Sequence, residues 1–513
     1  MAQTQIISLP AEIVVEISGY LPNRDVKNLR LACRHLASAA LHFPRVFIGP
    51  NRRNINVFLA VARHESFRRR VTEIIVDDAI LPRAGAHIDN QQVGLSLEPG
   101  ADGTGYSAQH RPSWATTVCQ GNIERMLDDN NIDHDWLRHS MVDQIDTADA
   151  WPIYVRMLDE QVHYTATDHV RRALDLGLER FVNLRKVTIT SATHGAPFNP
   201  LYRTPTIRAL PPNINYPRPK GWLTRQDTWS TDPAWEDDGP AYFGFRTLLR
   251  ALAENKDNGK VTQLVIDASF FTLNGINMSL FDSDNATLRD LQTVVSRPTL
   301  RQLHLHFRDY RPNSMQPHFH RQDALGSLLS QAAGGQGVEE MALGLSDAEI
   351  FDFLTILPPP SLARLKHLTL SYITTDLETF VDFLAELPPT LETLTLKTLL
   401  FDAPMAQADG KTPKLLVRIR DDLRWGQRPR PPKVLLGFQA SSNPRRFAAS
   451  HLRCVWIDAD DFLYHGGLNP LYHFRSYRYG VQDDVWYPRS STIVPEISNH
   501  IPLVPGYQIT HYR

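Results

Sequence analysis

The sequence predicts an α/β protein in which strands and helices alternate behind three short N-terminal helices. Three observations support this prediction. Apolar residues recur at helical spacing over the first 40 or so positions, a short apolar pattern with the period of a β-strand returns along the rest of the chain, and helix-like stretches separate its copies. At 513 residues the chain has room for a large core and for two or more structural units.

The N-terminal stretch "ISLPAEIVVEISGYLPNRDVKNLRLACRHLASAA" contains the signals of three short helices. Pro10 suits the first turn of a helix, and an apolar stripe of Ile13, Ile17 and Leu21 follows at a spacing of four. Pro22 ends that helix and Asn23 can cap the next one. Because about forty residues rarely bury enough surface to be stable alone, we expect another surface to cover the stripe: the following domain or a partner.

The order of residues in this stretch resembles the F-box, a three-helix module of ubiquitin ligases. The resemblance spans residues 6–47 and rests on Leu9-Pro10, Glu12-Ile13, Ile17, Leu21-Pro22, Asp25, Leu29, Leu31 and Cys33. It implies docking onto a Skp-type adaptor and, through it, onto a cullin. The adaptor-binding residues that it implies are Leu9, Pro10, Ile13, Ile17, Leu21, Pro22 and Leu29. Residues 48–70 are predicted to form a linker helix.

A second pattern, apolar residues spaced as L-x-x-L-x-L, recurs through residues 71–460. It reads "VTEIIV" from Val71, "LRKVTI" from Leu184, "VTQLVI" from Val261, "LRQLHL" from Leu300, "VEEMAL" from Val338, "LKHLTL" from Leu365, "LETLTL" from Leu391, "PPKVLL" from Pro431 and "LRCVWI" from Leu452. The last four residues of each copy alternate as in a strand with one buried face.

These copies resemble leucine-rich repeats, most clearly where "DFLTILPPPSLARLKHLTL" is followed by "DFLAELPPTLETLTL". The resemblance implies an irregular, leucine-rich-repeat-like α/β solenoid with long loop insertions as the substrate domain. A generic α/β domain is the alternative. The insertions are predicted at about 81–120 and 193–240, where Gly, Pro and acidic residues gather, and residues 461–513 are predicted to form a C-terminal strap over the last strand.

Residues that alternate with the buried positions of these strands should form one open polar face. We expect the target protein to bind there, through Gln302, His304, His306, His367, Thr369, Ser371, Thr393, Thr395 and Lys397. The aromatic 193–240 insertion is a second place where a ligand could bind.

Composition argues against several function classes. Lys and Arg number 54 against 56 Asp and Glu, so no net charge attracts nucleic acid or an anionic membrane. Three scattered cysteines form neither a disulfide framework nor a metal motif. No signal peptide or membrane span is recognisable. We therefore expect an intracellular protein, cytoplasmic or nuclear, with neither nucleic acid nor membrane as a partner and without a cofactor.

Candidate catalytic and metal motifs are weak. "YHGGL" from Tyr464 resembles an esterase oxyanion loop, but no G-x-S-x-G nucleophile motif follows it. His304, His306, His318 and His320 could supply metal ligands, although a surface role is the simpler interpretation. Adjacent acids, Asp77-Asp78 and Asp460-Asp461, are interpreted as solvated strand ends. We therefore expect neither a catalytic nor a metal-binding residue.

The function that these features predict is substrate recognition in a Skp–cullin–F-box E3 ubiquitin ligase, by a non-catalytic subunit. An F-box scaffold or assembly factor without a degradative role is the alternative. A small-molecule receptor or an enzyme, with a ligand under the 193–240 insertion, is the third class considered.

Overall fold

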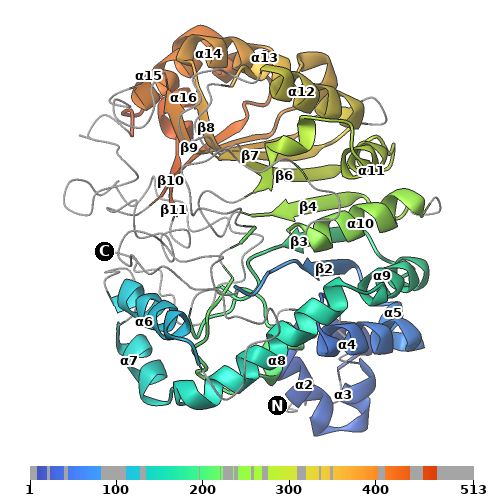
Figure 1. Cartoon of the computed structure of the whole chain (residues 1–513). Coiled ribbons are helices and arrows are strands. Elements are labelled where there is room, and N and C mark those ends of the chain that lie inside the picture. Colours follow the sequence, from blue (N-terminus) through green and yellow to red (C-terminus); the bar gives the residue numbers. More distant parts are fainter. Residues whose placement is uncertain are drawn as a thin grey trace, which may run out of the picture.

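One long β-sheet dominates the computed structural model, with helices outside it (Figure 1). The structure describes residues 9–19, 23–39, 44–82, 111–127, 134–195, 197–219, 221–222, 235, 241–255, 259–268, 275–308, 319–333, 337–346, 351–401, 411–439 and 454–470.

Eleven strands form this sheet within the described residues. They are β1 (Arg45–Ile48), β2 (Glu73–Asp77), β3 (Lys186–Thr190), β4 (Gln263–Asp267), β5 (Ile276–Asn277), β6 (Gln302–Arg308), β7 (Glu340–Ser346), β8 (His367–Thr375), β9 (Thr393–Phe401), β10 (Lys433–Gln439) and β11 (Cys454–Asp458). Each of the nine strands expected from the L-x-x-L-x-L pattern is present.

The strands lie side by side in chain order, and all pairs are parallel except β10 with β11. The short β5 is off this path and pairs with the end of β6. Register is uniform across the sheet: Leu303 faces Met341, which faces Leu368, which faces Leu394. This register places the aligned apolar positions of neighbouring strands on the same face, because side chains alternate along a strand.

Sixteen α-helices are assigned in the described part of the chain. They are α1 (Ala11–Gly19), α2 (Asn23–Ala32), α3 (Arg34–Ala39), α4 (Arg52–Arg63), α5 (Glu65–Arg68), α6 (Ser113–Leu127), α7 (His134–Val142), α8 (Thr147–Thr165), α9 (His169–Arg180), α10 (Phe243–Glu254), α11 (Ala286–Val295), α12 (Phe319–Ala333), α13 (Phe353–Ile356), α14 (Leu377–Ala385), α15 (Lys411–Arg418) and α16 (Asp460–Tyr464).

Successive helices from α4 to α15, apart from α5 to α8, pack on one another in a row along one face of the sheet. The main core lies between this row and the apolar sheet face, and it is continuous from β1 to α16. Phe58 of α4, Phe245 of α10 and Phe181, which directly follows α9, are fully buried in it, as are Leu370 and Leu394 from the sheet. Burying such side chains supplies roughly 1.5–3 kcal/mol each, so this face is the main source of stability.

The predicted fold class, a small three-helix F-box followed by an irregular leucine-rich-repeat-like solenoid, is wrong. The structure is an α/β fold with a single open, nearly all-parallel sheet and alternating helices. The L-x-x-L-x-L pattern identifies a strand with one apolar face, and any parallel sheet covered by helices contains such strands. The pattern therefore located the strands but did not determine whether they form a solenoid or an open sheet.

The N-terminal boundary also differs from the expected one. Residues 45–48 form strand β1, which pairs with β2 from Arg45↔Glu73 to Ile48↔Val76. The sheet therefore begins at Arg45 and not at Val71. The expected linker helix at 48–70 corresponds to α4 and α5, and Ile55 and Phe58 of α4 belong to the main core.

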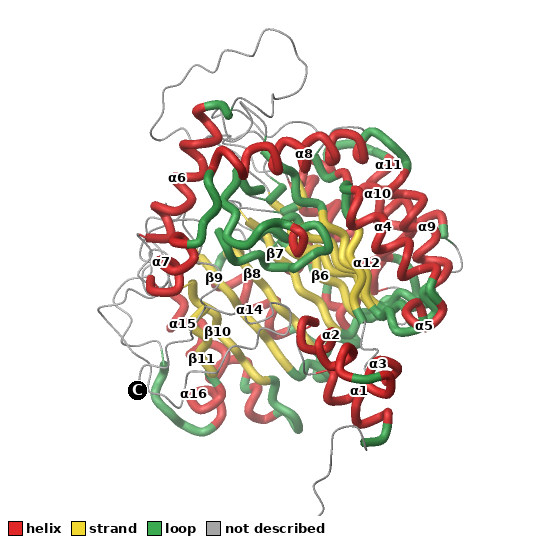
Figure 2. Tube along the Cα trace, turned by 90° about the horizontal axis from the view of Figure 1, so that it is seen from below, coloured by secondary structure: helices red, strands yellow, loops and turns green. Residues whose placement is uncertain are grey.

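The predicted loop insertions contain ordered structure. The first includes the start of α6, while residues 83–110 lie outside the described part of the chain. Helices α6 and α8 build a second core with Leu81, Ile214 and Tyr216. Figure 2 shows α6 on the side away from the helix row and α8 between α6 and that row. In the second insertion Tyr202, Tyr216 and Trp222 are buried. Of the predicted C-terminal strap, residues 471–513 lie outside the described part. None of the described helices is both long and apolar enough to cross a membrane.

Candidate functional site

The polar face of the sheet holds all nine residues predicted to contact a target. They lie in three rows across β6 to β9. The first row is Gln302, Glu340, His367 and Thr393; the second is His304, Ala342, Thr369 and Thr395; the third is His306, Gly344, Ser371 and Lys397. The contribution of β7 to these rows was missed in the sequence, although its strand pattern, "VEEMAL", was recognised.

This face is less open than the sequence suggested. Gln302 and His306 are only 7% and 6% exposed, and the other predicted contact residues are half-buried. On the opposite face the alternating leucines Leu368, Leu370, Leu394 and Leu396 are at most 2% exposed.

Glu340 organises the first row. Its Oε1 accepts hydrogen bonds from Nε2 of Gln302 at 2.8 Å and pairs with Nε2 of His304 at 2.9 Å. A carboxylate that accepts from an imidazole N–H fixes the orientation of the ring, as well as the proton position. His367 lies in the same row, with Nδ1 3.2 Å from the Thr393 hydroxyl. These contacts hold the polar side chains in defined positions, so the face is preorganised.

The third row forms a cation–aromatic cluster. Nζ of Lys397 lies 5.5 Å from the centre of the Tyr372 ring, and the His306 ring is 5.9 Å from the same ring. Burial and the nearby Lys397 charge lower the pKa of His306 to about 3, so this imidazole is neutral at pH 7. Gly344 is required beside it, because a Cβ at that position would lie 2.4 Å from His306 Nδ1.

No group of three or more His, Cys, Asp or Glu side chains in the described residues is placed to hold a metal ion. His304 and His306 share the polar face, while His320 lies on α12 and contacts Asp282 at 3.1 Å. His318 lies outside the described residues. The four histidines considered as metal ligands are thus not brought together by the described part of the fold.

The N-terminal helices form a small cluster of their own. Val14 and Leu36 are its buried core, and Leu9, Leu29 and Cys33 pack partly against them. Ser18 donates to the Val14 carbonyl oxygen at 2.6 Å and is fully buried.

The predicted adaptor contacts divide between exposed and packed positions. Pro10 is exposed, Ile13 is 41% exposed, and Ile17 is half-buried. Leu31, which belongs to the resemblance, is 74% exposed. Leu9 and Leu29 are half-buried in the cluster, whereas Leu21 and Pro22 lie outside the described residues. Pro10, Ile13 and Leu31 are therefore exposed apolar side chains of the N-terminal helices.

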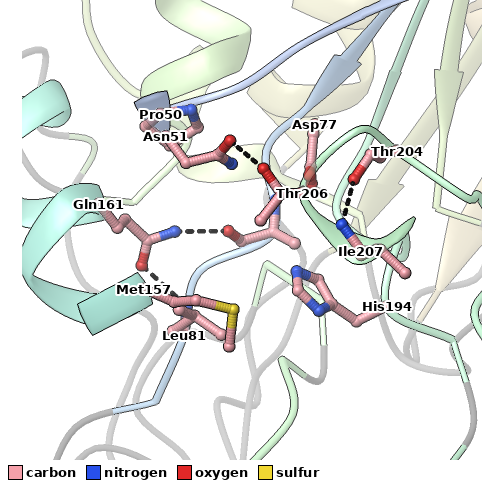
Figure 3. A pocket seen from close by; sticks show the side chains of 11 residues that line it. Pro50, Asn51, Asp77, Leu81, Met157, Gln161, His194, Thr204, Thr206 and Ile207 are labelled. Atoms are coloured by element: carbon pink, nitrogen blue, oxygen red, sulfur yellow. Dashed lines mark hydrogen bonds between the residues drawn. The ribbon is translucent and has the colours of Figure 1, made fainter. Parts of the chain in front are cut away.

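A polar cavity of about 20 Å³ lies at the carboxyl ends of β1, β2 and β3 (Figure 3). This volume has room for one water molecule. Gln161 of α8 spans it, donating to the Ala79 carbonyl at 2.8 Å and accepting from the Leu81 N–H at 2.9 Å. His194 Nδ1 lies 2.7 Å from the Tyr216 hydroxyl, and burial lowers the pKa of His194 to about 3. The cavity lies between α8 and the segments that follow these strands.

Asp77 and Asp78 at this edge are not solvated strand ends, because they are only 4% and 2% exposed. Asp77 Oδ1 accepts from the Thr193 hydroxyl at 2.5 Å and from the Ala79 N–H at 3.3 Å. Burial raises the pKa of Asp77 to about 7 and the pKa of Asp78 to about 6, against the lowering effect of these hydrogen bonds.

Asp78 has a structural partner in helix α10. It accepts hydrogen bonds from the N–H groups of Gly244 and Phe245, at 2.6 and 3.2 Å, and from Trp222 Nε1 at 2.7 Å. A carboxylate there satisfies N–H groups that a helix leaves open at its first turn and offsets the positive end of its dipole. Of the second acidic pair, Asp460 is half-buried and accepts from the Val434 N–H at 3.0 Å, whereas Asp461 is exposed.

Comparison of the chain with protein-family models finds no match, and comparison with curated protein sequences finds none either. Two features of this molecule are suited to binding a partner: the exposed apolar side chains of the N-terminal helices and the polar sheet face.

Proposed function

We propose that this chain is a substrate-recognition subunit of a Skp–cullin–F-box ubiquitin ligase. The observation that carries the proposal is the exposure of the apolar side chains of Pro10, Ile13 and Leu31 on a helical cluster whose own core contains two buried side chains, Val14 and Leu36. Because so small a core contributes little stability, a partner that covers the exposed apolar side chains would stabilise the cluster. In this proposal a Skp-type adaptor covers these side chains and links the chain to a cullin.

The target protein binds the polar sheet face in the same proposal. Rows of half-buried polar groups fixed by Glu340 and by the Lys397–Tyr372 contact offer hydrogen bonds at little further ordering cost. The chain then makes or breaks no bond itself. It raises the local concentration of the target near the conjugating enzyme, which the rest of the complex supplies.

A scaffold or assembly factor that binds the adaptor without promoting degradation is the alternative. The two proposals differ in the fate of the partner bound by the sheet face. If the chain selects substrates, removing it raises the level of that partner; if it is a scaffold, the level stays unchanged.

The adaptor contact is tested by exchanging Ile13 and Leu21 for Asp. Two carboxylates in a desolvated apolar interface cost several kcal/mol, so we expect the variant to lose the adaptor in co-purification from cells that express both proteins. The control is Val142→Asp, because Val142 is 83% exposed on α7 and far from α1 in the chain. Retention of the adaptor by the Ile13/Leu21 variant would refute the adaptor proposal.

A further inference from the structure

A groove of about 480 Å³ opens where the connection from α5 to β2 runs beside the connection from α9 to β3. Its walls are formed by Arg68, Arg69, Glu179, Arg180, Val182 and Asn183. Asn183 Nδ2 donates to the Arg69 carbonyl at 2.6 Å and so ties the two connections together. The groove lies at the amino ends of the strands and uses none of the residues assigned to the adaptor or to the target.

Charge around the groove is strongly positive. Residues 65–72 and 179–185, which comprise the two connections with α5 and the end of α9, carry five arginines (Arg68, Arg69, Arg70, Arg180 and Arg185) and two glutamates (Glu65 and Glu179), an excess of three positive charges. Arg69 and Arg180 pair with the two glutamates in exposed contacts of 2.6 and 3.2 Å, which are weak in water. Among the described residues, Arg68, Arg70 and Arg185 contact no carboxylate.

This excess is local, because the whole chain has a net charge of −2. Further along the same edge of the sheet the cations have a carboxylate partner: Lys366 pairs with Glu339 at 2.7 Å and Arg301 lies 3.7 Å from the same carboxylate. Like charges kept together without partners destabilise a folded protein slightly, so an unbalanced cluster is expected where a ligand supplies the opposite charge.

We propose that this groove binds an acidic segment of a partner protein. Guanidinium groups pair with carboxylates in a bidentate geometry, and Arg68, Arg69 and Arg180 line the groove from both sides. Val182, which is 52% exposed at the wall, adds an apolar contact. The matching ligand is a peptide in which carboxylate side chains flank an apolar residue.

A polypeptide fits this groove better than a nucleic acid does. The carboxylate of Glu179 forms part of the wall, and a phosphate chain, charged at every step, cannot avoid it, whereas a peptide can place an apolar or neutral residue there. Recognition of single strands also uses aromatic side chains on which bases stack, and the wall residues include none. The proposal is independent of adaptor binding by α1.

The test measures binding of a fluorescein-labelled peptide, Gly-Glu-Asp-Leu-Asp-Glu-Gly, to the full chain by fluorescence polarisation at several salt concentrations. We expect binding that weakens with salt and an increase in Kd of about tenfold or more in a variant with Arg68, Arg69 and Arg180 changed to Glu. The control variant changes Arg53, Arg172 and Arg430, exposed arginines outside both connections, to Glu and should stay within about twofold of the wild type.

Other outcomes overturn the proposal. It fails if the wild-type chain does not bind the peptide, if the control variant loses as much affinity as the groove variant, or if a twelve-nucleotide single strand binds the groove more tightly than the peptide at equal salt. Circular dichroism establishes that each variant is folded. If the triple charge reversal prevents folding, the variant with Gln at the same three positions provides the same comparison.

Discussion

Asp77 is a single carboxyl group whose environment couples folding to pH. Hydrogen bonds from Thr193 and Ala79 favour the charged carboxylate and lower its pKa. Burial has the larger effect and raises this pKa from 3.8 to about 7. The folded chain therefore holds this proton more tightly than the unfolded chain does. Stability from this group is present below pH 4 and is lost as the pH rises towards 7.

Replacing Asp77 with Asn should remove this pH dependence. The amide oxygen can still accept both hydrogen bonds, and the charge that burial disfavours is gone, so the variant should gain on the order of 1–3 kcal/mol relative to the wild type above pH 7. Urea denaturation of both proteins at pH 5 and pH 7.5 measures the difference.

The wild type must be compared with the variant, because His194 and His306 change the stability with pH in the direction opposite to Asp77. Their lowered pKa values make folding more favourable as the pH rises from 3 to 6.5. A difference between the two proteins that stays constant between pH 5 and pH 7.5 would contradict the assignment of the effect to Asp77.

At the scale of elements, the two faces of β8 and β9 have separate roles. Leu368 and Leu394 face the helix row, while Thr369 and Lys397 face the opposite side, where Glu340 and Tyr372 fix the neighbouring groups. Strand alternation produces this separation. Changes on the polar face should therefore alter binding, and changes on the other face should alter stability.

Exchanging Thr369 and Lys397 for Glu should release the target and retain the adaptor. The variant adds two negative charges to a half-buried polar surface, and removing favourable contacts at a hot spot costs about 2 kcal/mol or more. Affinity capture with mass spectrometry of the bound proteins measures the outcome.

The matched control places the same two changes on the helix row. Thr379→Glu on α14 and Lys414→Glu on α15 change exposed residues of the same types. The sheet face is not the recognition surface if the captured proteins are the same in both variants and in the wild type.

At the scale of the whole molecule, one core connects the helix row with the apolar sheet face from β1 to α16. Leu394 is fully buried in this core, near the start of β9, between β8 and β10. Removing its side chain leaves a cavity that close-packed neighbours fill only in part.

Leu394→Ala should lower the free energy of unfolding by roughly 2–5 kcal/mol. Thermal and urea denaturation monitored by circular dichroism measure the loss, with Leu354→Ala as the control because Leu354 is 36% exposed on α13. An equal loss of unfolding free energy in the two variants would show that the burial of Leu394 does not determine the size of the effect.

The sequence alone determined those features that depend on residues close together in the chain. The alternation of apolar residues predicted nine strands and identified which side chains of β6, β8 and β9 share the polar face. Helical spacing and prolines likewise predicted the three N-terminal helices, α1, α2 and α3. These features depend on neighbours in the chain, so they can be read without knowing the fold.

Only the tertiary structure decided which segments meet. Arg45–Ile48 forms the first strand because β2 lies beside it. Glu340 of β7 orients His304 of the neighbouring strand β6. Asp78 accepts a hydrogen bond from the first turn of α10, more than 160 positions away in the chain. Burial of Asp77 likewise depends on α8 and on the segment around Thr193. Such contacts join residues distant in the chain, and no local pattern records them because the free energy that selects them comes from packing the whole sheet.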